Sequence, residues 1–173
     1  MRTAESPISA YCSISLATMK FIAGFWLGMA PGVQASTMDL DEARQFIQAN
    51  HRTILATFRA DGRPQLSPVA VAVDGAGRAA VSSRETAFKV KNLRRDPRAS
   101  LCVVSDAWYG EWIQADGTAS IVSLPEAMDP LIDYYRSVAG EHPDWDDYRA
   151  AMERERRVIV RIELERAGPD HQG

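Results

Sequence analysis

A series of short β-strand patterns separated by tight turns constrains the fold of this 173-residue chain more than any other feature. Residues 52–59 (RTILATFR) and 65–73 (QLSPVAVAV) flank the turn ADGRP, and Asp61-Gly62 within that turn indicates a β-hairpin. Further strand patterns occupy residues 79–83, 99–106, 111–123 and 158–167. Six short strands with few long helices predict a small, mainly antiparallel barrel, because a parallel doubly wound sheet needs a helix after nearly every strand.

Four segments have the periodicity of amphipathic helices and are expected around the edge of the barrel. They are Asp39–Asn50, Thr86–Arg95, Pro125–Ala139 and Trp145–Arg156. The second lies between two strands, and Asp96-Pro97 is expected to end it because proline disfavours helical angles in the preceding residue. We therefore expect one mainly β (α+β) domain over residues 38–173, with peripheral helices.

The first 37 residues are expected to be a leader outside that fold. Their apolar stretch, Phe21–Ala30, has about ten residues and is too short to cross a bilayer as a helix. Lys20 precedes it and small residues follow, as in a signal peptide that would be cleaved after Ala35. The alternative is a misassigned start codon, with translation beginning at Met38. We favour this alternative because the remainder looks like a complete domain, and we expect a cytoplasmic protein with no membrane partner.

Composition disfavours several classes of function. The net charge of -3 and the pI near 5.6 lack the basic field of a typical nucleic-acid-binding protein. Neither of the two cysteines, Cys12 and Cys102, belongs to a CxxC or Cys/His spacing, so no disulfide framework or zinc site is expected. The sequence also lacks HExxH, GxGxxG and Walker-type motifs. We expect no metal site, and we assign no catalytic residue.

Positive charge is concentrated in the string KVKNLRRDPR, from Lys89 to Arg98. Residues 84–98 contain six basic and two acidic side chains, a local charge of +4 in an acidic protein. A helix start with several cations favours phosphate, because free N–H groups and the helix dipole attract negative charge. The alternative is a basic face that contacts only solvent.

The second half of the chain has the opposite charge. Residues 126–155 contain nine acidic side chains and three arginines, a local charge of -6. The basic and acidic segments would complement each other across a dimer interface. A solvated helical surface is the alternative explanation.

Four segments resemble the split β-barrel oxidoreductases related to pyridoxamine 5'-phosphate oxidase, and more narrowly the branch that uses the deazaflavin coenzyme F420. The segments are ILATFRADGRPQLSPV, SSRETAFKVKNLRRDPRASL, GTA and YYRSVAGEHPDWDDYRAAM, in order between Asp39 and Arg166. The resemblance implies a six-stranded antiparallel split β-barrel of the FMN-binding type. It also implies a homodimer, with a cofactor groove between the subunits and basic residues that hold the cofactor phosphate and acidic tail.

The same resemblance implies a set of cofactor-binding residues. Lys89 and Asn92 would hold the phosphate-bearing side chain of the cofactor, with Lys91 nearby and Ser82 contributing a hydroxyl. Arg63, Gln65 and Ser67, on the second strand of the hairpin, would line the deazaflavin ring and tail. The three arginines of the string have a structural role as an alternative to ligand binding; they are Arg94, Arg95 and Arg98.

The activity implied is hydride transfer between reduced F420 and an unsaturated small-molecule substrate. An alternative is the same barrel with flavin mononucleotide (FMN), which also offers a phosphate and a planar tricyclic ring. Another alternative is a non-catalytic F420 carrier, which would need the cationic site but no substrate pocket.

Overall fold

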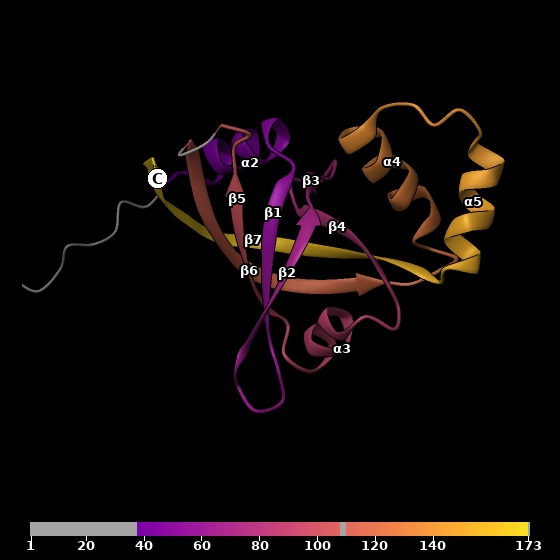
Figure 1. The fold of residues 1–173 in the computed structure, drawn as a ribbon, viewed down its shortest axis with the longest axis horizontal. Helices are drawn as coiled ribbons and strands as arrows, with labels where there is room; N and C mark the ends of the chain where they lie inside the picture. Colours follow the sequence, from indigo (N-terminus) through magenta and orange to yellow (C-terminus); the bar gives the residue numbers. More distant parts are fainter. Residues whose placement is uncertain (1–37, 108–109, 173) are drawn as a thin grey trace, which may run out of the picture. The chain divides into compact units, whose positions relative to one another are not determined.

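The described part of the chain forms a curled antiparallel sheet with four peripheral helices (Figure 1). The computed structural model describes residues 38–107 and 110–172, and the expected leader, residues 1–37, lies outside them. Seven strands are arranged in the order β2-β1-β5-β6-β7-β4-β3. Their bounds are β1 Arg52–Phe58, β2 Pro64–Ala70, β3 Ala72–Val73, β4 Ala79–Arg84, β5 Arg98–Val104, β6 Glu111–Val122 and β7 Arg157–Gln172.

The predicted fold class is confirmed, although the sheet has seven strands where six were expected. The extra strand arises because the segment expected as one strand, residues 65–73, divides at Val71 into β2 and β3. β2 pairs with β1, whereas β3 pairs with β4 at the opposite end of the strand order. A single residue thus joins the two ends of the sheet, which curls back on itself as a split barrel.

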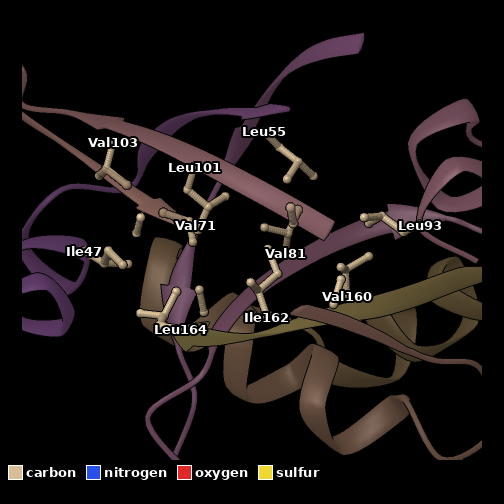
Figure 2. Close-up of a cluster of buried hydrophobic side chains, with 14 of the residues drawn as sticks. Ile47, Leu55, Val71, Val81, Leu93, Leu101, Val103, Val160, Ile162 and Leu164 are labelled. Atoms are coloured by element: carbon tan, nitrogen blue, oxygen red, sulfur yellow. The ribbon is translucent and has the colours of Figure 1, made fainter. Parts of the chain in front are cut away.

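Alternating side chains fill the inside of this barrel. In β5, Ala99, Leu101 and Val103 are buried, while the residues between them face outward. The same period of two in β7 directs Val158, Val160, Ile162 and Leu164 inward, as the sequence predicts. Figure 2 shows members of both strands, among them Leu101, Val160 and Ile162, converging with side chains of other strands on one apolar cluster.

Helices cover the openings and one outer face of the sheet. Helix α2, Leu40–Ala49, inserts Ala43 and Ile47 into the barrel cluster. Helix α3, Phe88–Arg95, adds Val90 and Leu93. Helices α4, Met128–Ala139, and α5, Trp145–Arg154, form a second cluster against the outer face of β4 and β7.

The junction at Val71 is held by one histidine. The backbone N–H of Val71 donates to the carbonyl oxygen of His51 at 2.9 Å, and Nδ1 of His51 lies 2.9 Å from the carbonyl oxygen of Val71. Because a carbonyl oxygen only accepts, Nδ1 carries the proton in this contact. His51 thereby satisfies both backbone polar groups of a fully buried residue between two strands.

We expect His51→Ala to lower the free energy of unfolding by about 1–3 kcal/mol, because it leaves the buried Val71 carbonyl without a donor. Urea denaturation followed by circular dichroism measures this change. His51→Asn is the matched control, since its amide nitrogen takes the approximate place of Nδ1 and should restore much of the loss. Equal stability of the wild type and the alanine variant would show that the side-chain contact is dispensable.

Candidate functional site

A groove lies at the split of the barrel, where β2 and β4 contact each other without being neighbours in the strand order. We call it the split groove. Its volume is 280 Å³. It is lined by Pro68, Val69, Ala70, Ser82, Ser83, Arg84, Ala87, Lys89 and Arg157. One wall is therefore the end of β2, the other is β4 with the adjoining residue of β7, and the start of α3 borders the groove.

Three cations line the split groove, and two of them share one carboxylate. Arg84 and Arg157 are cross-strand partners, and Glu155 pairs with both, at 3.1 Å and 2.7 Å. Lys89 makes no hydrogen bond or ion pair with any residue of the described part of the chain. Burial, and secondarily the charge of Arg157, lower the pKa of Lys89. The groove therefore has a local excess of positive charge that an anion would neutralise.

One serine that lines the split groove has a hydroxyl without a partner. Ser83 is only 3% exposed, and its Oγ makes no hydrogen bond within the described residues. This oxygen is closed to solvent and lies on the opposite face of β4 from Ser82, so it is a buried unsatisfied group and not a ligand contact. Lys89 and the partly exposed Ser82 make the groove suitable for an anionic ligand with oxygen acceptors.

The structure brings two of the seven predicted site residues into the split groove: Ser82 and Lys89. Asn92 of α3 and Gln65 of β2 instead contact each other, outside the lining of the groove. The Asn92 amide nitrogen donates to Gln65 at 2.8 Å and to the Thr57 hydroxyl at 3.1 Å, and its oxygen accepts from Arg95 at 3.2 Å. Asn92 is 6% exposed, so these contacts use its amide to fasten α3 to β1 and β2.

The other three predicted residues occupy different surroundings. Ser67 is buried on β2, next to the groove residue Pro68. Lys91 is exposed, with its ammonium 5.4 Å from the centre of the Phe88 ring. Arg63 lies in the β1–β2 turn, where its side chain is 80% exposed.

The three arginines of the basic string all have partners within the protein. Arg94 pairs with Glu85 and also donates to the Ser123 hydroxyl. Arg95 donates to the Phe58 carbonyl and to Asn92. Arg98 forms a two-point ion pair with Asp96, and this hydrogen bonding lowers the pKa of Asp96 to about 2. Of the two explanations left open by the sequence, the structural role fits these contacts.

Sequence reasoning missed Arg84 and Arg157 as candidate site residues. Arg84 was counted in the basic segment, but nothing distinguished it from the other cations. Arg157 lies 73 positions further along the chain and reaches the groove only because it is the cross-strand partner of Arg84. That register is a tertiary property, so no local motif indicates it.

Tyr134 of α4 bridges the two walls at one end of the split groove. Its hydroxyl donates to the Ala70 carbonyl of β2 at 3.0 Å. Burial raises the pKa of Tyr134, and a hydrogen bond from the Ser82 backbone of β4 partly opposes this rise. One phenol therefore connects strands that share no ladder.

The described ranges, 38–107 and 110–172, contain no group of three or more histidine, cysteine, aspartate or glutamate side chains that could hold a metal ion. No helix in these ranges has the length and apolar character needed to cross a membrane.

The chain is similar to a known family and to several solved structures. The model of the pyridoxamine 5'-phosphate oxidase family matches residues 40–168. The conserved hypothetical protein Rv2991 from Mycobacterium tuberculosis is 26% identical, with a TM-score of 0.63 over 80% of this chain and 88% of that one. An F420 reductase is 20% identical, with a TM-score of 0.57 over 72% and 94%. HutZ, a heme storage protein from Vibrio cholerae, is also 20% identical, with a TM-score of 0.58 over 79% and 98%. The last two share the fold alone.

We expect Asn92→Ala to lower the free energy of unfolding by about 1–3 kcal/mol, because Thr57 and Gln65 lose a buried hydrogen-bond partner. Lys91→Ala, one residue away on the exposed face of α3, is the control and should change it by about 0.5 kcal/mol or less. Chemical denaturation measures both. A stability of Asn92→Ala equal to that of the control would contradict the structural role and favour the predicted ligand contact.

Proposed function

Because this chain belongs to the pyridoxamine 5'-phosphate oxidase family, we propose that it is an F420-dependent oxidoreductase acting on an unsaturated small molecule. The main support for this proposal is the split groove, where Lys89 has no counterion among the described residues and lies beside two arginines. A cofactor with a phosphate and an acidic tail supplies the missing negative charge. The F420 reductase among the similar structures supports the choice of cofactor within this fold.

Different residues of the split groove would bind different parts of such a cofactor. Lys89 would pair with the phosphate or tail, and the hydroxyl of Ser82 would donate to its oxygens. The apolar wall formed by Pro68, Val69 and Ala70 would exclude water from the bound ring. When bound, reduced F420 supplies a hydride to an electron-poor double bond. Positioning is the main contribution of the protein to such a reaction.

We propose that the predicted site residues outside the groove lining act on the cofactor from a distance or through the groove walls. Lys91 and Arg63 are exposed cations that would attract the acidic tail. Gln65 and Asn92 would act through their mutual hydrogen bond, which fixes α3, and hence Lys89, against β2. Ser67 would support the adjacent groove wall at Pro68.

We also propose that the chain forms a homodimer that covers the split groove. The outward residues of β2 are Pro64, Leu66, Pro68 and Ala70, all exposed and apolar. Leu66 is 65% exposed, and Phe88, beside Lys89, is 73% exposed. Large apolar side chains exposed in this way are typical of an interface. Pro68 and Ala70 belong both to this row and to the groove lining, so a partner packed on β2 would border the cofactor.

A heme-binding role suits the groove less well. Heme iron takes an axial ligand from histidine, cysteine, methionine or tyrosine. None of these residue types is among the nine described residues that line the split groove. The cationic lining instead favours a phosphorylated cofactor.

Fluorescence titration of the full chain with F420, FMN and heme tests the cofactor. We expect F420 to bind most tightly and Lys89→Ala to weaken its binding by about 10- to 100-fold, the loss of one charge-assisted hydrogen bond. Lys91→Ala, which removes an equal charge outside the groove lining, should have the smaller effect. Glu155→Gln should strengthen binding, because it removes the carboxylate that competes for Arg84 and Arg157.

Two results of this titration would contradict the proposal. Tighter binding of FMN or heme would overturn the F420 assignment, and an unchanged affinity of Lys89→Ala would remove Lys89 from the site. Mixing reduced F420 with a panel of enones and quinones then separates an enzyme from a carrier. Binding without oxidation by any member of the panel would favour the non-catalytic carrier.

We expect Leu66→Arg to shift the dimer towards monomer and to weaken F420 binding, because it places a charge in the apolar row. Sedimentation velocity measures the oligomeric state over a range of protein concentrations. Ala150→Arg, on the exposed side of α5, adds the same charge elsewhere and is the control. A variant Leu66→Arg that stays dimeric would exclude this row as the interface.

A further inference from the structure

A second cavity lies on the other side of Tyr134 from the split groove. It has a volume of 480 Å³, within the usual range of small-molecule sites. It is lined by Ala72, Val73, Asp74, Gly75, Ala76, Arg78, Ala80, Pro130, Asp133, Tyr134, Ile159 and Arg161. None of these residues lines the split groove. We call this space the α4 cavity, because α4 packs against β3, β4 and β7 around it.

The inner wall of the α4 cavity is apolar and built from small side chains. Ala72 of β3 and Ala80 of β4 are directly paired across the ladder, so their side chains lie on the same face. Both are almost completely buried, and Ile159 and Pro130 complete the apolar surface. A larger residue at either alanine would fill the space, so this pair makes room for an apolar group.

The polar part of the cavity centres on Asp74. Its Oδ1 accepts from the backbone N–H groups of Ala76 and Arg78, both at 3.0 Å, and its Oδ2 accepts from Nε of Arg78 at 2.9 Å. Burial alone would raise the pKa of Asp74, but the hydrogen bonds from Arg78 and Ala76 outweigh it and lower the pKa. Asp74 therefore stays ionised, with most of its acceptor capacity used by its own turn.

The guanidinium of Arg161 has N–H donors that find no acceptor among the described residues. Its side chain is 24% exposed, and its one ion pair places Nε 3.5 Å from Oδ2 of Asp74. It makes no hydrogen bond within the described part of the chain. The second carboxylate of the cavity lining, Asp133, is 78% exposed, and it lies 3.9 Å from Arg136, a residue outside the lining. Apart from the exposed Asp133, the cavity lining therefore holds two arginines against one carboxylate.

We infer that the α4 cavity binds a small organic acid, with an apolar body on the alanine pair and a carboxylate on Arg161. A partly buried guanidinium with free donors recognises a carboxylate through two parallel hydrogen bonds. The apolar wall selects a compact ring or branched chain over a bare inorganic anion. The site is separate from the cofactor groove, and it does not depend on which cofactor that groove takes.

Isothermal titration of the full chain with benzoate tests the site, and benzamide is the neutral ligand of the same shape. We expect benzoate to bind at roughly millimolar concentration and benzamide to bind at least tenfold more weakly. Arg161→Gln should lower benzoate affinity by about tenfold or more, and Ala80→Val should abolish binding by filling the cavity. Arg59→Gln removes an exposed charge between β1 and β2, outside this lining, and should leave the affinity unchanged.

Amide chemical shifts of the unmodified protein locate the ligand even if a variant fails to fold. Benzoate should shift the amides of Ala72, Ala76, Ala80 and Tyr134. Shifts at Lys89 and Ser83 in their place would put benzoate in the split groove and overturn the inference. Equal affinities for benzoate and benzamide, or no detectable binding of benzoate at all, would overturn it as well. No cofactor is present in these measurements, so their failure is distinct from failure of the proposed function.

Discussion

The fold depends on the passage of the chain from one end of the sheet to the other at a single residue, Val71. β2 and β3 flank it and pair with strands at opposite ends of the strand order. This short connection forces the sheet to curl, and the curl leaves β2 beside β4 without a ladder between them. The split groove is the direct result. Its walls are held by two side-chain contacts, from His51 at the junction and from Tyr134 across the split.

The cationic side chains discussed above differ in whether another group of the protein pairs with them. Arg94 and Arg95 have internal partners that fasten α3 to the barrel, and Arg98 pairs locally with Asp96. Lys89 has no such partner among the described residues, and it borders the split groove. In the α4 cavity, Asp74 is used mainly by Arg78, so Arg161 remains poorly satisfied. A cation that has no partner among the described residues therefore indicates a candidate site better than a dense run of charges in the sequence does.

Local patterns predicted most of the fold, and their failures have a common cause. The alternation in β7 and the amphipathic character of α2 follow from burial on one face, so both were predictable. The division of residues 65–73 into two strands was not, because both halves have the same β character and only their distant partners differ. Asn92 shows a related limit within the candidate site. Its ligand contact stays a prediction from the motif, while its hydrogen bonds to Thr57, Gln65 and Arg95 are set by tertiary packing that no local pattern indicates.

The carboxylate shared by Arg84 and Arg157 has a consequence for selectivity. Glu155 already neutralises much of their charge, so an arriving anion must exchange with an internal carboxylate instead of displacing loosely held ions from solution. A monovalent ion such as chloride gains little from that exchange. A multivalent phosphate or an oligocarboxylate gains more, because it engages Lys89 at the same time. Ionic strength should then affect occupancy of the groove less than the number of its cations suggests.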